Sequence, residues 1–147
     1  MGILGRWLGR GQRVALLVDG PNVFRSEFDV DLADLRAVAE ERGRVTVARC
    51  YFDVNATPGL LQAAEAHGFE VAVTSGDVDV SLAVDATELA AEGAVDVLVI
   101  ASRDMDFKPA LEAANRRGVR TVAVAPSAYG RSEALSAVAD EALTLGE

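Results

Sequence analysis

Residues 95–107 have the sequence VDVLVIASRDMDF, and this stretch decides the fold class of the chain. Six of its first seven residues are apolar, and four of these are Val or Ile. A strand of a parallel sheet has this composition when helices cover both of its faces. Asp104 and Asp106 follow soon after the strand ends at Ser102. Ligands bind beyond the carboxyl ends of such strands, so these carboxylates are site candidates, although Asp also caps helices.

A second buried strand with a polar end occurs early in the chain. Residues 13–18 read RVALLV and run into DGPN at residues 19–22. Gly and Pro make the chain turn at this point. The turn leaves Asp19 and Asn22 at the carboxyl end of this strand, just as Asp104 and Asp106 follow the carboxyl end of the strand over 95–101.

Strands and helices alternate along the rest of the chain. The patterns predict further strands over 44–52, 69–74, 95–101 and 119–125, and helices over 32–42, 58–67, 79–92, 107–117 and 132–143. Alternation of this kind produces right-handed βαβ units and a parallel sheet. We therefore expect a doubly wound, Rossmann-like α/β fold with five strands in the order 3-2-1-4-5 and helices on both faces. The winding then reverses between strands one and four, where a crevice opens.

A third acidic segment, DVDVSLAVD, occupies residues 77–85 and leads into a predicted helix. Asp79 and Asp85 are six residues apart, which places them about 240° apart around a helix. They cannot both face the crevice from a regular helix. Asp79 is the preferred site residue because it lies at the helix start. Asp85 either joins the site from the side or finds a partner such as Ser81, since an unpaired carboxylate is costly in an apolar stretch.

Several carboxylates gathered in one crevice require a cation, because like charges raise one another's pKa. The candidate metal ligands are Asp19, Asp79, Asp85, Asp104 and Asp106, and the same set without Asp85 forms the candidate catalytic residues. Oxygen ligands without His or Cys select Mg²⁺ or Mn²⁺. Such an ion positions phosphate and activates water, so metal-assisted phosphodiester hydrolysis is the leading reaction class. Four further residues are candidates for binding the substrate: Asn22, Ser102, Arg103 and Lys108.

Composition narrows the class of protein. The 147 residues suit one domain over 13–147, preceded by a flexible leader over 1–12. A single cysteine, Cys50, fits the reducing cytoplasm, and no apolar run is long enough to cross a bilayer. The net charge of −9 counts against unspecific affinity for nucleic acid, but a bound metal would supply local positive charge. The exposed edge strands of such a sheet and Trp7 in the leader are compatible with a homodimer.

Three motifs together resemble the signatures of the NYN domain, the LabA-like branch of the PIN-like nucleases. They are VDGPN at 18–22, VDVSLAVD at 78–85 and ASRDMDF at 101–107. The resemblance extends over residues 13–143. Within the family, the chain looks most similar to the stand-alone archaeal members. It implies a Rossmann-like sheet, a divalent-metal site and cleavage of RNA.

Carried over by motif, the acidic residues would be Asp19, Asp79 or Asp85, Asp104 and Asp106, assisted by Asn22 and Ser102. The chain departs from the family pattern in two places. Arg103 stands where Gly is common, and Gly76 and Asp77 stand where a Lys is common. The missing Lys implies weaker substrate binding.

Three functions therefore compete. The first is a Mg²⁺- or Mn²⁺-dependent ribonuclease. The second is a non-catalytic module of the same fold that binds RNA or a protein, which the acidic charge favours. The third is a small-molecule phosphohydrolase or nucleotide-binding protein. The sequence lacks the P-loop, the G-x-G-x-x-G fingerprint and the G-x-S-x-G elbow, which disfavours P-loop phosphate binding, dinucleotide binding and serine hydrolysis.

Overall fold

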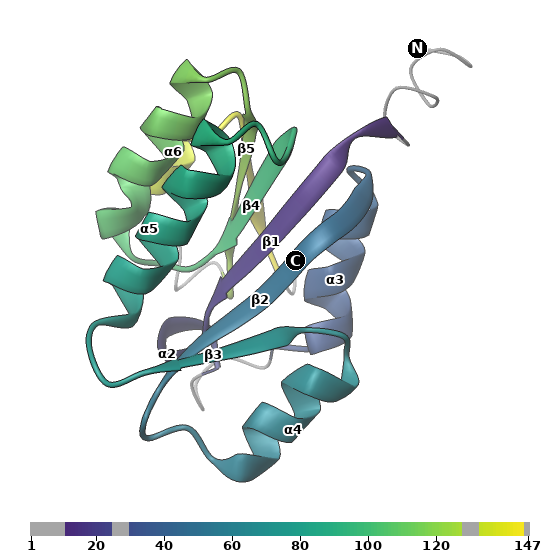
Figure 1. Cartoon of the computed structure of the whole chain (residues 1–147), viewed down its shortest axis with the longest axis vertical. Helices are drawn as coiled ribbons and strands as arrows, with labels where there is room; N and C mark the ends of the chain where they lie inside the picture. Colours follow the sequence, from purple (N-terminus) through teal and green to yellow (C-terminus); the bar gives the residue numbers. More distant parts are fainter. Residues whose placement is uncertain (1–10, 25–29, 128–132, 146–147) are drawn as a thin grey trace.

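The computed structural model describes residues 11–24, 30–127 and 133–145, which form one twisted sheet flanked by helices (Figure 1). The sheet order is β3-β2-β1-β4-β5-β6, and every neighbouring pair is parallel. The strands are β1 (Arg13–Asp19), β2 (Arg44–Asp53), β3 (Glu70–Thr74), β4 (Val97–Ala101), β5 (Arg120–Ala125) and β6 (Glu141–Thr144). The predicted order of the first five strands is confirmed. The predicted leader lies outside the described residues, except for residues 11 and 12.

The prediction of five strands is wrong, because the chain adds a sixth. The expected final helix stops early: α7 spans Glu133–Val138, and β6 then pairs with β5. Hydrogen bonds explain the change of direction. The carboxylate of Asp140 accepts from the backbone N–H of Thr121 at 2.9 Å, and the backbone N–H of Asp140 donates to the Thr121 hydroxyl at 3.0 Å. These bonds fix residue 140 to β5, so the following residues continue as a strand beside it.

The helices divide between the two faces of the sheet, as the doubly wound prediction requires (Figure 1). One face carries α2 (Gly20–Val23), α3 (Leu32–Glu40) and α4 (Pro58–Ala66). The other carries α5 (Val78–Ala91), the 3₁₀ turn η1 (Met105–Phe107), α6 (Lys108–Arg116) and α7. The winding reverses between β1 and β4, and in open α/β sheets the crevice that binds ligands lies at the carboxyl ends of such strands.

The helix boundaries follow local chemistry that the sequence already displays. Asp31 caps α3 by accepting from the backbone N–H of Ala33, and Thr57 caps α4 with Pro58 as the first helical residue. Gly118 follows α6 with a φ of 80°, a left-handed conformation that favours glycine at a helix end. The predicted bounds of the helices α3 to α6 are therefore correct to within two residues.

The two central strands are the most buried elements of the sheet. Every residue of β4 is buried, and so is every residue of β1 after Arg13. Their apolar side chains alternate between the two helical layers, so both strands are fixed on both faces. Cys50 in β2 is also buried. Within the described residues, no helix is long and apolar enough to cross a membrane.

Candidate active site

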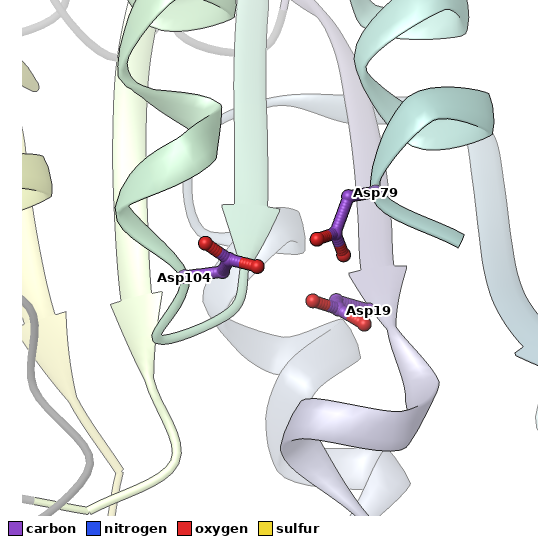
Figure 2. Close-up of side chains that lie close together, drawn as sticks. All are labelled: Asp19, Asp79 and Asp104. Atoms are coloured by element: carbon purple, nitrogen blue, oxygen red, sulfur yellow. The ribbon is translucent and has the colours of Figure 1, made fainter. Parts of the chain in front are cut away.

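Three carboxylates converge at the carboxyl edge of the sheet, where the winding reverses. Asp19 ends β1, Asp104 follows β4, and Asp79 lies in the first turn of α5. One carboxylate oxygen of each lies within 4.8 Å of the other two. Figure 2 shows the three carboxyl groups pointing toward one another. The structure thus brings together three of the predicted acidic residues from three separate segments.

The strand pairing accounts for this convergence. Val18 of β1 lies opposite Ala101 of β4 in a parallel register, so both chains leave the sheet at the same level. Asp19 comes directly after Val18, and the loop after Ala101 carries Asp104. The helix α5 packs against β1 and starts beside the same edge, which brings Asp79 to the crevice.

Asp19 is fully buried, and two side chains fix its orientation. Its Oδ2 accepts hydrogen bonds from Asn22 Nδ2 at 2.6 Å and from Ser102 Oγ at 2.8 Å. Its Oδ1 is buried and has no hydrogen-bond partner among the described residues. Leaving a buried carboxylate oxygen unsatisfied is costly, which indicates a missing ligand at this position.

Asp104 is oriented by the backbone of its own loop. The Ser102 hydroxyl accepts from the backbone N–H of Asp104 at 3.0 Å, and Asp104 Oδ1 accepts from the backbone N–H of Asp106 at 2.9 Å. Ser102 therefore links Asp19 to the Asp104 loop. Sequence reasoning identified Ser102 and Asn22 as substrate-binding candidates, whereas the structure places both against Asp19.

Gly20 allows the turn that returns Asn22 to Asp19. A Cβ atom at Gly20 would lie against the carbonyl oxygen of Tyr51 and 2.5 Å from Cδ1 of Phe52. Any side chain there would push α2 away from β2. The Gly in the DGPN segment is thus required by a close backbone approach, which a turn prediction alone does not reveal.

Burial and mutual repulsion alter the charge state of the cluster. Burial raises the pKa of Asp79 to about 7, together with a hydrogen bond to Asp104 and the negative charges of Asp104, Asp19 and Asp106. Burial also raises the pKa of Asp19, against the opposing hydrogen bonds from Asn22 and Ser102. In the absence of a cation Asp79 therefore retains a proton up to about pH 7, whereas an isolated aspartate loses its proton at about pH 4.

The residues present fit a hard divalent cation. Three carboxylate oxygens lie within 4.8 Å of one another, close enough for one cation to contact all three. One of the carboxylates, Asp19, has a buried oxygen without a hydrogen-bond partner among the described residues. The group contains neither a nitrogen nor a sulfur ligand. Such a donor set suits Mg²⁺ or Mn²⁺ rather than zinc.

The other predicted site residues lie around this group. Asp106 is exposed and lies outside the three-carboxylate group, although its charge contributes to the raised pKa of Asp79. Lys108 is exposed at the start of α6, and Arg103 is partly buried next to Asp104 in sequence. Arg103 and Lys108 are thus two cationic residues in the loop and the helix that follow β4.

Asp85 lies apart from the three carboxylates and has partners of its own. Its Oδ2 accepts from the Tyr51 hydroxyl at 2.6 Å and from Arg49 Nη1 at 3.0 Å. Sequence reasoning anticipated a partner for Asp85 but did not identify Arg49 or Tyr51. The available signal was their spacing of two residues, which puts both side chains on the same face of β2.

The fold and the site define a class: a Rossmann-like α/β protein with a carboxylate cluster at its topological switch point. The model of the NYN domain family matches residues 13–146, and the chain belongs to this family. The resemblance noted from the three motifs is thereby confirmed.

Two known proteins extend the comparison. An uncharacterized protein of Methanocaldococcus jannaschii is 41% identical over 135 residues, which are 92% of this chain and 56% of that protein. The chain therefore spans little more than half of this archaeal relative. The crystal structure of a protein of unknown function from Vibrio parahaemolyticus has the same fold, with a TM-score of 0.79 and 24% identity over 92% of this chain and 94% of that one.

Replacing Gly20 by Ala should destabilise the protein. The new methyl group forces α2 away from β2, and overpacking of this kind costs about 1–3 kcal/mol in the free energy of unfolding. Urea denaturation measures the change. Gly59→Ala is the matched control: Gly59 is exposed in α4 with no atom within 4 Å of the added Cβ, so it should be neutral or stabilising. Equal stability of Gly20→Ala and wild type would contradict the close packing.

The stability of the metal-free protein should fall as the pH rises from about 4 to about 7. Over this range folded Asp79, with its pKa of about 7, holds a proton that the unfolded chain has already released. Its contribution is complete below pH 4 and lost above pH 7. Urea denaturation in EDTA should show that Asp79→Asn reduces this slope, while Asp77→Asn, an exposed neighbour, retains it. An unchanged slope in Asp79→Asn would contradict the assignment.

Proposed function

We propose that this NYN domain is a ribonuclease that depends on Mg²⁺ or Mn²⁺ and hydrolyses RNA phosphodiester bonds at Asp19, Asp79 and Asp104. The observation that carries the proposal is the cluster itself, with three carboxylate oxygens within 4.8 Å and a buried, unpartnered oxygen on Asp19. Membership of a family generally associated with RNA supports the choice of substrate.

The three carboxylates would hold the cation, which supplies a Lewis acid for phosphate and lowers the pKa of an attacking water. The chain's own residues provide the orientation. Asn22 and Ser102 fix Oδ2 of Asp19, which leaves Oδ1 without a protein partner among the described residues and able to bind the cation. Two backbone-anchored hydrogen bonds fix Asp104 in the same way. This preorganisation avoids the cost of arranging charged groups at the moment of reaction.

The surrounding charges determine how RNA approaches. The chain carries a net charge of −9, so its overall field repels a polyanion. Arg103 and Lys108 lie beside the Asp104 loop and would contact phosphates that flank the cleaved bond. Asp106, exposed at the same loop, would face the substrate rather than the three-carboxylate group. We therefore expect RNA binding to depend on the cation and to weaken with salt.

The second candidate is a non-catalytic module of the same fold that binds RNA or a protein. The acidic net charge favours it, as does the absence of a Lys before Val78, where Gly76 and Asp77 stand. This alternative predicts binding that does not require a divalent cation and that persists after loss of Asp19.

The purified protein should cleave single-stranded RNA in Mn²⁺ and stop cleaving in EDTA. Asp19→Asn, Asp79→Asn and Asp104→Asn should each lower the rate by more than about 100-fold, since even residues that only orient metal ligands cost 10–100-fold. Asn22→Ala and Ser102→Ala should lower the cleavage rate by about 10–100-fold, because these residues only orient Asp19. Gel analysis of a labelled RNA measures the rates.

Asp77→Asn is the control, because Asp77 is exposed two residues from Asp79 and lies outside the cluster. It should cleave at the wild-type rate. No cleavage by the wild type, or equal cleavage by wild type and Asp104→Asn, would contradict the ribonuclease. RNA binding that persists in EDTA and in Asp19→Asn would then favour the non-catalytic module.

A further inference from the structure

A pocket of about 400 Å³ lies next to the carboxylate site, between the end of β3 and the start of α5. Its volume is in the range of small-molecule sites. The lining includes Tyr51, Val73, Thr74, Val80, Ser81, Val84 and Asp85. Two facts place it beside the cluster. Val80 directly follows Asp79 in α5, and Tyr51 is the register partner of Asp19.

Part of the pocket wall is formed by exposed apolar side chains. Val80 and Val84, one turn apart on α5, are 59% and 48% exposed, and they are two of the four exposed large hydrophobic residues among those described. Exposed apolar residues gathered in a hollow mark a binding surface. Val54, which is also exposed, does not line this pocket.

One polar group in the lining has unused capacity. Asp85 Oδ2 is held by the Tyr51 hydroxyl and by Arg49, so the carboxylate is fixed and its charge is paired. Its Oδ1 makes no hydrogen bond within the described part of the chain, and the side chain is 33% exposed. A rigid, partly exposed carboxylate oxygen in an apolar pocket is suited to accept a hydrogen bond from a flat, uncharged donor.

We propose that this pocket receives the base of the nucleotide beside the cleaved phosphate and selects bases that donate an exocyclic amine to Asp85. The inference rests on the ribonuclease function proposed above. Val80 and Val84 would contact a face of the base, and Asp85 Oδ1 would accept from the exocyclic amine that cytosine, adenine and guanine carry and uracil lacks. A phosphate does not suit this position because its oxygens, like Asp85 Oδ1, are hydrogen-bond acceptors, whereas the amine of a base is a donor.

The dimensions agree with one nucleotide. Adjacent strands lie about 4.8 Å apart, so Asp19 in β1 and Ala72 in β3, which are in register through Tyr51, are separated by about 10 Å across β2. A phosphate at the carboxylates and its base in the pocket span a similar distance. Uracil presents a carbonyl where cytosine has its amine, and that carbonyl would face the Asp85 oxygen.

Binding of short oligoribonucleotides tests the proposal independently of cleavage. In Mn²⁺, fluorescence anisotropy should show oligo-C and oligo-A binding about 5-fold or more tightly than oligo-U, in line with one well-placed base contact. Asp85→Asn should reverse the order in favour of oligo-U. The amide can retain the bond from Tyr51 through its oxygen and donate to a uracil carbonyl through its nitrogen.

A second pair of variants does not depend on the Arg49–Tyr51–Asp85 network. Val84→Trp should fill the mouth of the pocket and weaken binding of all three oligonucleotides about 10-fold. Val54→Trp is the matched control, since Val54 is 69% exposed and outside the pocket, and it should bind as the wild type does. Circular dichroism confirms that each variant is folded.

Mapping the cut positions in a mixed-sequence RNA separates this proposal from the function beneath it. Cleavage without base preference, unchanged in Asp85→Asn, would overturn the base pocket and leave the ribonuclease intact. Base preference in binding without any cleavage would instead contradict the ribonuclease and retain the pocket. A change of oligomeric state in Val84→Trp with unchanged RNA binding would assign the valines to a protein interface and overturn the proposal.

Discussion

Mutual repulsion among three carboxylates is the constraint on which the rest of this structure depends. Asp19, Asp79 and Asp104 bring oxygens within 4.8 Å of one another, and Asp19 is completely buried. Such an arrangement costs free energy, which appears in the raised pKa values of Asp79 and Asp19. A fold tolerates this cost only if surrounding interactions hold the groups in place, or if a cation offsets their charge.

The centre of the sheet supplies that rigidity. Strands β1 and β4 are buried on both faces, so the chain leaves the sheet at fixed positions on either side of the crevice. Asn22, Ser102 and the contact of Gly20 with β2 then orient the carboxylates. The pocket lined by Val80, Val84 and Asp85 lies beside this site, between α5 and the end of β3. Position along the sheet edge thus separates the chemistry at β1 and β4 from the recognition proposed at β3.

Strand ends and helix starts are predictable from the sequence because apolar runs and capping residues are local signals. Together with the expected strand order, these signals predict that Asp19, Asp79 and Asp104 share one crevice. The parts that escape prediction depend on contacts between distant residues. The strand β6 forms because Asp140 bonds to Thr121 in β5, and Asp85 is held by Arg49 and Tyr51 from β2. Local patterns can place Arg49 and Tyr51 on one face of β2, but they do not pair these residues with Asp85, nor Asp140 with Thr121.

The central claim is that a divalent cation occupies the space among Asp19, Asp79 and Asp104. Anomalous diffraction from crystals soaked in Mn²⁺ tests it most directly, because the signal locates the ion without reference to activity. We predict one strong peak at coordination distance from all three carboxylates, next to Oδ1 of Asp19. A map with no peak there at saturating Mn²⁺, or with Oδ1 of Asp19 bonded to a protein donor instead, would contradict the account.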